Sequence, residues 1–336
     1  EKYLYERERS GAFFVKAVLK GAYRVPEETK KRVRENIDEV LHFGLDTADY
    51  GKHGLLKGDT RSLMMQLGSG ALTNPSIIDQ TYKTINSNNL WHHDFVHWLR
   101  FMDFPVLRHL GLMPLCSRVI NYFQNGMSLE SAKVHVVRTG HYKVSVLEDY
   151  FPGSFGAQKN TLAITLDNGT PFYINHPLRP CPMEGADKFP FDTAAAPSYF
   201  GGYNVAPLAH IMDDCTVAVI YRLPLFRGAF APCRAIHYTH AYFDRERYDE
   251  VILKGNRLFA RAGDSFMAVL AKEDLTLISP DLIQKGRNTY WLVILSDTEK
   301  ETFDAFVKRV SDIRVSFDGF TLKAGDQSIR YRKKLP

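Results

Sequence analysis

The sequence predicts an α+β protein, with a helical segment at residues 1–104 followed by a large antiparallel β-sandwich at residues 105–336. Two observations predict this order. Apolar residues recur at spacings of three and four in the first part of the chain, as on one face of a helix. After Pro105, which ends that pattern, short runs of alternating apolar and polar residues are separated by turn sequences, as in antiparallel sheets.

Length and composition fit a globular protein. The 336 residues are enough for two domains or one large one, and 45% of them are hydrophobic and 24% charged. The net charge is +5, and the basic clusters at 30–34 and 330–334 lack interleaved aromatic residues, so we expect no nucleic-acid partner. No run approaches the ~20 apolar residues of a membrane span, so we expect no membrane partner. The four cysteines form no CxxC pair, which argues against a zinc ribbon.

The helical part contains two segments with clear patterns. The first helix is expected to begin at Pro26 and to end at Gly44, because proline suits the first helical position and glycine commonly follows the last one. Its apolar stripe consists of Val33, Ile37, Val40 and Leu41. A further helix is expected over residues 88–100, with an apolar face of Trp91, Phe95, Trp98 and Leu99. Pairs of such helices are typical of an α/α-hairpin array.

The β part contains one clear hairpin. Two apolar runs within residues 161–177 flank Asp167-Asn168-Gly169-Thr170, and Asn-Gly accepts the positive φ angles of a tight turn. Gly263-Asp264 and Asp318-Gly319 are further turn sequences.

One helix is expected late in the chain, over residues 298–312. Asp297 or Thr298 is expected to cap its N-terminus. Its apolar face consists of Phe303, Phe306, Val307 and Val310.

The junction between the two halves resembles that of the large polysaccharide lyases. Those proteins, which include chondroitin/hyaluronate lyases and heparinase II/III-type lyases, join an α/α toroid to an antiparallel β-supersandwich. The matching positions at the junction are Met102-Asp103, Arg108-His109, Ser117-Arg118-Val119-Ile120 and Asn121-Tyr122. The stretches at 197–210 and 239–244 are similar to segments of such β-domains in bacterial carbohydrate-active proteins. Phe104 stands where the lyases tend to have arginine.

The resemblance implies a secreted or periplasmic enzyme that cleaves an acidic, uronate-containing polysaccharide by β-elimination. The helical part is shorter than a complete toroid, which implies a missing N-terminal portion, a partner chain or a reduced relative. Two alternatives stay open. One is a glycoside hydrolase on the same scaffold, working with paired carboxylates. The other is a non-catalytic carbohydrate-binding or assembly domain.

Elimination on a uronate requires three groups. One neutralises the carboxylate, a base removes the C5 proton, and an acid, often a tyrosine, protonates the departing O4. In the helix at 88–100, Asn89 is the expected neutraliser, Trp91 a stacking face and His93 the base. His93 and His97 share a helical face, and their spacing also suits zinc, although the glutamate of HExxH is missing. The alternative is a polar helix face whose aromatic residues pack inward.

Two segments of the β part supply the remaining candidates. Tyr199, Tyr203, Asn204 and His210 follow a long Pro-, Ala- and Gly-rich loop, and Tyr203 is the expected acid. A loop tyrosine with a packed ring is the alternative. The resemblance makes His240 an inward-facing functional histidine, against the alternative of a hydrogen-bonded core histidine.

These candidates are expected to meet in one groove, where the 88–100 helix reaches the β-domain. The expected catalytic residues are His93, Tyr203 and His240, and the expected substrate-binding residues are Asn89, Trp91, His97, Tyr199 and Asn204. The expected ligand is a polysaccharide or oligosaccharide. No cofactor fingerprint is present, and a structural divalent metal stays open, with no ligands assigned.

Overall fold

The computed structural model describes residues 39–44, 85–92, 105–112, 115–116, 119, 131–150, 160–177, 205–223 and 236–333. In chain order its strands are β1 (Glu39–Gly44), β2 (Ser131–Arg138), β3 (Tyr142–Glu148), β4 (Leu162–Leu166), β5 (Pro171–Asn175), β6 (Leu208–Asp213), β7 (Thr216–Arg222), β8 (Tyr238–Tyr242), β9 (Glu250–Lys254), β10 (Arg257–Ala262), β11 (Ser265–Ala271), β12 (Leu275–Ile278), β13 (Asp281–Lys285), β14 (Asn288–Asp297), β15 (Val315–Phe317), β16 (Thr321–Ala324) and β17 (Gln327–Arg330). The helices with both ends described are η2 (Leu90–His92), α6 (Pro105–His109), η5 (Arg245–Arg247) and α8 (Phe303–Ser311).

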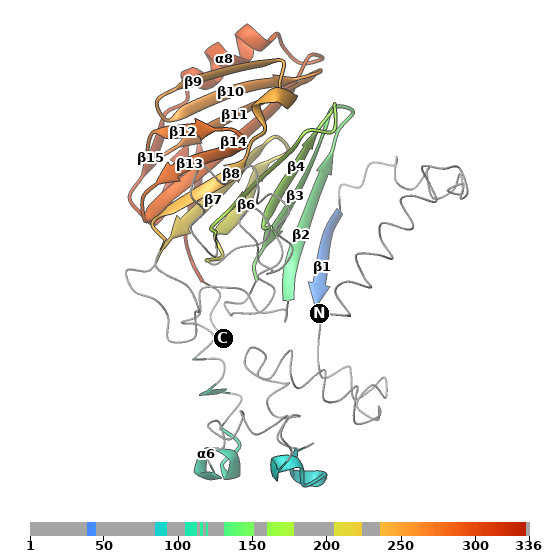
Figure 1. The fold of residues 1–336 in the computed structure, drawn as a ribbon, viewed down its shortest axis with the longest axis vertical. Coiled ribbons are helices and arrows are strands. Elements are labelled where there is room, and N and C mark those ends of the chain that lie inside the picture. The colour runs from blue at the N-terminus through green and yellow to red at the C-terminus, as the bar shows by residue number, and fades with distance from the viewer. Residues whose placement is uncertain are drawn as a thin grey trace, which may run out of the picture. The chain divides into compact units, whose positions relative to one another are not determined.

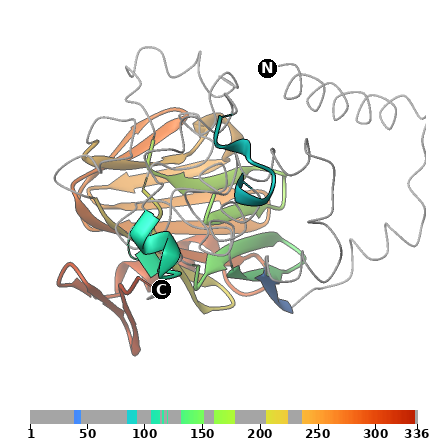
Figure 2. The same cartoon turned by 90° about the horizontal axis from the view of Figure 1, so that it is seen from below.

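The strands form three sheets, which can be followed in Figure 1 and, after a turn of 90°, in Figure 2. The largest has the order β1-β2-β3-β4-β5-β8-β13-β12. A six-stranded sheet has the order β6-β7-β14-β11-β10-β9, and a small sheet the order β15-β16-β17. All of these strand pairs are antiparallel, as the sequence predicted.

A hydrophobic core lies between the eight-stranded and six-stranded sheets. Along β3, the buried residues Tyr142, Val144 and Val146 alternate with more exposed neighbours, as expected for a strand with one face on a core. Val219 and Trp291 of the six-stranded sheet belong to the same core. The indole of Trp291 donates a 2.8 Å hydrogen bond to the Thr239 hydroxyl of the facing sheet, so its one polar group is satisfied.

The six-stranded sheet is also covered on its other face, by α8 and the small sheet. The residues of this second core are Ala218, Ile220, Phe259, Phe266, Ala268, Leu270, Tyr290, Leu292, Ile294, Phe303, Phe306, Val310, Leu322 and Ile329. Cover on both faces explains why β11 and β14 are buried along almost their whole length. Their sequences are accordingly near-continuous apolar runs rather than alternating ones.

The late helix is confirmed as α8. Phe303, Phe306 and Val310 are buried, and Val307 packs against the same core. The predicted caps, Asp297 and Thr298, are wrong, because the capping residue is Thr302, whose hydroxyl accepts a 3.3 Å hydrogen bond from the Ala305 N–H. Asp297, Thr298 and Thr302 are all good capping residues, and the helix begins directly after the last of them.

An arginine from the sheet holds the C-terminal end of α8. Arg257 of β10 donates hydrogen bonds of 2.8–2.9 Å to the carbonyls of Val310, Ser311 and Ile313. Carbonyls at this end of a helix have no partner within the helix, and a cation there also complements the helix dipole.

The predicted hairpin at 161–177 is confirmed as β4 and β5. The Leu166 carbonyl accepts from the Gly169 N–H, and the Leu166 N–H donates to the Thr170 carbonyl, each at 2.9 Å. Gly169 has a φ of 80°, while Asn168 instead uses its side chain, which accepts from the Thr170 N–H at 3.0 Å. The turn predicted at Gly263 joins β10 and β11, with a φ of 59° at the glycine.

Three helical predictions differ from the structure. Residues 39–44, expected to end a helix, form β1 and pair along their full length with β2. Valine, leucine and phenylalanine in this segment suit a strand as well as a helix, and backbone pairing with β2 decides between them. Pro105, expected to end a helix, begins α6, because the N–H that proline lacks has no partner in the first helical turn.

The third difference concerns Asn89 in the helix predicted over 88–100. Asn89 has a φ of 51°, and residues 90–92 form a 3-10 turn, so no regular α-helix runs through 88–92. The rest of that segment, and most of the predicted helical part at 1–104, lie outside the described residues. Among the described helices, none is long and apolar enough to cross a membrane.

The packing of the second core allows us to predict the effect of a substitution on stability. Phe306 is fully buried and its ring lies 5.9 Å from that of Phe266, so Phe306→Ala should lower the free energy of unfolding by about 3–5 kcal/mol. Denaturant unfolding measures this loss. Lys308→Ala, on the exposed side of the same helix, serves as control and should change the value by less than about 0.5 kcal/mol. Equal losses in both variants would contradict the packing described here.

Candidate functional site

Three of the eight predicted site residues fall within the described part of the chain. These are Asn89, Trp91 and His240. His93, His97, Tyr199, Tyr203 and Asn204 lie outside it, so the groove predicted from all eight residues stays a prediction. Asn89 is exposed, and the indole of Trp91 donates a 2.7 Å hydrogen bond to the Asn86 side chain.

His240 lies on β8 and is closed to solvent. Its Nδ1 is 2.9 Å from Asp281 Oδ1 on β13, and both side chains are 0% exposed. Ala241 on the same strand belongs to the core between the sheets, so His240 lies on the opposite face of the eight-stranded sheet. A histidine held in this way by a carboxylate has a fixed tautomer and ring orientation. That arrangement serves a core histidine as well as a functional one.

Polar and aromatic groups surround His240 on the same face. Asn175 of β5 is its direct cross-strand neighbour, and the ring of Tyr238 meets the imidazole edge-on at 6.2 Å. Tyr173 and Tyr242 form a second cross-strand pair, with stacked rings 5.3 Å apart. Asn175 is 2% exposed, and among the described residues neither its amide nitrogen nor its amide oxygen has a hydrogen-bond partner. Sequence reasoning missed Asn175, because its neighbour His240 is 65 positions away and only strand pairing brings them together.

A different cluster combines titratable groups with access to solvent. Its members, called the Glu148 cluster below, are Lys133 and His135 on β2, Glu148 and Asp149 at the end of β3, and His210 on β6. Glu148 Oε1 lies 2.9 Å from His210 Nδ1, and its Oε2 lies 3.1 Å from His135 Nε2. The side chain of Glu148 is only 8% exposed, whereas that of His210 is 47% exposed.

The position of Glu148 follows from the strand pattern. It continues the inward-facing row of β3, after Val144 and Val146, at the point where the two sheets meet. There its carboxylate accepts a 2.7 Å hydrogen bond from the backbone N–H of Ile211, on the edge strand β6. Covering an exposed N–H in this way protects a sheet edge from other strands. The same contact fixes the carboxylate beside His210.

Electrostatics reinforce the cluster. Burial alone raises the pKa of Glu148, but the hydrogen bonds from His210 and from the Ile211 N–H outweigh it and leave the pKa below its usual value. The hydrogen bond to Glu148 raises the pKa of His210 despite its partial burial. Carboxylate and imidazolium therefore stabilise one another. Because Nδ1 of His210 donates to Glu148, the proton-accepting lone pair of the neutral ring is on Nε2.

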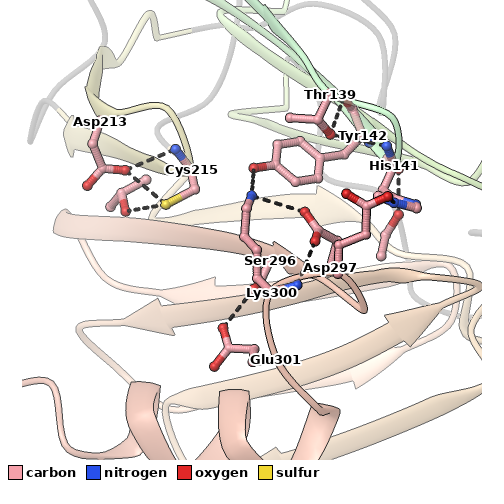
Figure 3. Close-up of polar contacts among 12 residues, drawn as sticks. Thr139, His141, Tyr142, Asp213, Cys215, Ser296, Asp297, Lys300 and Glu301 are labelled. Carbon is pink, nitrogen blue, oxygen red and sulfur yellow. Dashed lines mark hydrogen bonds and ion pairs between the residues drawn. The ribbon is translucent and has the colours of Figure 1, made fainter.

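A polar network at the other end of β3 fastens the two sheets (Figure 3). Lys300 Nζ lies 3.0 Å from Asp297 Oδ2 and 3.4 Å from the hydroxyl of Tyr142. Asp297 ends β14 of the six-stranded sheet, and Tyr142 begins β3 of the eight-stranded one. Burial raises the pKa of Tyr142, so its hydroxyl stays protonated. We assign this network a structural role.

Two groups of described residues could hold a metal ion, and His141 belongs to both. One ligand atom from each of His141, Asp167 and Asp264 lies within 4.8 Å of the others, as do those of His141, Asp297 and Glu299. The Glu299 carboxylate, 3.2 Å from His141 Nε2, raises the pKa of that imidazole. Asp297 is already paired with Lys300. Imidazole and carboxylate groups can bind a divalent cation, but no other feature of the described residues indicates a metal.

Cys215 lies in the turn between β6 and β7, as Figure 3 shows. Its Sγ donates to Asp213 Oδ1 at 3.1 Å, and its backbone N–H donates to the same oxygen at 2.9 Å. Burial, followed by the hydrogen bond to Asp213 and then the charge of that carboxylate, raises the pKa of the thiol to about 11. A thiol with this pKa is seldom ionised near neutral pH, so Cys215 is unsuited to nucleophilic catalysis.

Comparison with known proteins gives no family for this chain. No protein-family model matches it, and searches of curated proteins and of solved structures also found no match. Functional inference therefore depends on the geometry of the clusters described above.

The buried histidine–carboxylate pair makes a stability prediction. Either His240→Ala or Asp281→Ala should lower the free energy of unfolding by roughly 3–5 kcal/mol, because each breaks a fully buried ion pair. In the double variant the two losses should not add, with a coupling of about 0.5–3 kcal/mol. Lys285→Ala, at an exposed position of β13, is the control. Strict additivity in urea unfolding would mean that the two side chains do not interact.

The raised pKa of Cys215 predicts that its thiol reacts slowly with alkylating reagents. In a variant that retains Cys215 but has serine at 116, 181 and 233, alkylation by iodoacetamide at pH 8 should be slow. The raised pKa leaves roughly a hundredfold less thiolate than an unperturbed cysteine has. Asp213→Asn should lower that pKa and speed the reaction, as mass spectrometry can follow. An unchanged rate in Asp213→Asn would show that the carboxylate does not control the thiol.

Proposed function

We propose that the protein cleaves an acidic polysaccharide by β-elimination, with His210 as the base. One observation carries this proposal. His210 is 47% exposed while the buried carboxylate of Glu148 holds its Nδ1 at 2.9 Å. A polymer can reach only an accessible base, and a carboxylate on one ring nitrogen orients the other toward a substrate. His240 has a comparable carboxylate partner, but it is 0% exposed.

The neighbouring groups fit the other requirements of the reaction. His210 Nε2 takes the C5 proton, the electron pair forms the C4–C5 double bond, and the C4–O4 bond breaks. Lys133 supplies a cation that neutralises the uronate carboxylate and so makes the C5 proton more acidic. Tyr150 lies two residues beyond Glu148, and its hydroxyl donates to the Pro207 carbonyl just before β6. Once released from that carbonyl, Tyr150 is our candidate for protonating O4.

The same cluster fits a glycoside hydrolase less well. A hydrolase needs a carboxylic acid that stays protonated near neutral pH, which requires a raised pKa. In Glu148 the contacts with His210 and Ile211 lower the pKa instead. A non-catalytic binding domain, in turn, has no need for an imidazole oriented by a buried carboxylate. These arguments favour elimination, and product analysis separates the three functions.

Product analysis is the first test of this function. With a panel of polyuronates, the wild-type protein should release products that absorb in the ultraviolet, because elimination leaves an unsaturated uronate. His210→Asn should reduce the rate by roughly 100- to 10,000-fold, the usual contribution of a general base. His237→Asn, which changes an exposed histidine outside the cluster, should retain activity. New reducing ends without the absorbance would indicate a hydrolase, and binding without cleavage a binding domain.

The pH dependence tests the role of Glu148. A base must be unprotonated, so activity should rise with pH through the raised pKa of His210. Glu148→Gln removes the charge that raises this pKa, so the rising limb should move to lower pH while the maximal rate falls. The glutamine oxygen can still accept the Ile211 N–H, which helps to preserve the fold. If the pH at which activity rises is the same in Glu148→Gln as in the wild type, His210 is not the titrating base.

A further inference from the structure

Lys133 and Asp149 form an ion pair at the rim of the Glu148 cluster. Lys133 is the direct cross-strand partner of Glu148, so both side chains lie on the same face of the sheet. The Lys133 ammonium nevertheless pairs with the carboxylate of Asp149, the next residue along the chain. That hydrogen bond and the charge of Asp149 raise the pKa of Lys133, with a smaller contribution from Glu148. Lys133 and Asp149 also act electrostatically on His210, so the ion pair belongs to the same site.

Asp149 adopts a backbone conformation that is unfavourable for most residues. Its φ is 50°, and Asn89 is the only other non-glycine residue of the described part with a positive φ. Aspartate tolerates this region better than most side chains, but glycine adopts it at no steric cost. The conformation turns the chain directly after β3 and leaves the Asp149 carboxylate on Lys133. Backbone conformations of this kind often occur at functional sites.

The ion pair is open to solvent and therefore easily exchanged. The side chain of Lys133 is 40% exposed and that of Asp149 is 55% exposed. Exposed pairs contribute little to stability, because water and salt screen them. An incoming carboxylate could take the place of Asp149 on the ammonium at little cost. A buried pair such as His240–Asp281 could not exchange partners in this way.

We propose that Asp149 occupies the place of a substrate carboxylate, and that Lys133 is the residue that selects acidic over neutral polysaccharides. In the free protein the Asp149 carboxylate satisfies Lys133. When a uronate unit binds, its carboxylate replaces Asp149 on Lys133, beside the His210 imidazole. The identity of the ligand rests on the proposed function, but the selection is a property of binding and can be tested without cleavage.

Matched polymers provide the test. Binding of polygalacturonate, alginate and hyaluronate is measured by calorimetry at low and high salt, using the His210→Asn protein to minimise cleavage during the measurement. Fully methyl-esterified polygalacturonate is the neutral control, because it keeps the same sugar backbone. The His210→Asn protein, which is the parent of the variants below, should bind at least one acidic polymer more tightly than the ester. Lys133→Met should weaken that binding roughly 10-fold or more, the effect of losing a charge-assisted contact, and should leave the ester unaffected.

Variants of Asp149 separate competition from folding effects. Asp149→Asn removes the competing charge, and Asp149→Gly also suits the positive φ. Both should tighten binding of the acidic polymer by about 2- to 5-fold, the equivalent of one exposed ion pair. The ester should again be unaffected. Thermal unfolding of each variant checks that the fold is intact. The midpoint temperature of Asp149→Gly should be no lower than that of the parent.

Several outcomes overturn the proposal. These are equal binding of acidic and esterified polymer, unchanged affinity in both Asp149 variants, or no binding of any acidic polymer. The proposed function can fail separately: if acid-selective binding depends on Lys133 but the wild type forms no unsaturated product, the selection stands and the elimination does not.

Discussion

The six-stranded sheet is buried on both faces, and this constraint organises the rest of the described structure. Its central strands β14 and β11 contact the eight-stranded sheet on one side and α8 with the small sheet on the other. Apolar burial on two faces gives these strands the continuous hydrophobic sequences that they have. Two clusters of polar groups lie where these layers end. The Tyr142–Lys300–Asp297 network occupies one such end and the Glu148 cluster another, so the packing determines where chemistry can occur.

Glu148 illustrates how a structural need and a functional opportunity coincide. An ionised carboxylate at the edge of a core is costly unless hydrogen bonds replace its water. Here the Ile211 N–H and His210 do so, His135 adds a nearby imidazole, and the Ile211 contact also covers the edge of β6. The consequence for His210 is a fixed ring with a perturbed pKa and an exposed side, which are the properties of a general base. His240 has a similar partner in Asp281 but no exposure, so the two histidines differ in access rather than in local chemistry.

Local sequence signals predicted the elements that local interactions determine. The Asn-Gly turn predicted the β4–β5 hairpin, and the spacing of Phe303, Phe306 and Val310 predicted α8. The predictions failed where partners distant in sequence decide. Residues 39–44 became a strand because β2, about 90 positions later, pairs with them. The Glu148 cluster is likewise a product of pairing, since Ile211 lies 63 positions after Glu148. His240 was identifiable as a residue that needs a partner, but Asp281, 41 positions away, could not be named.

The clamp of Arg257 on the end of α8 has a consequence for the order of folding. A helix of nine residues is marginal in isolation, because nucleation costs more than so few hydrogen bonds return. Arg257 reaches carbonyls 53 to 56 positions later in the chain, so this end of the helix can be completed only after β10 is in place. Closing a loop of that length is slow compared with forming a local turn. The β10–β11 hairpin, with its two-residue turn, is therefore a natural early nucleus, and α8 should become ordered on a surface that already exists.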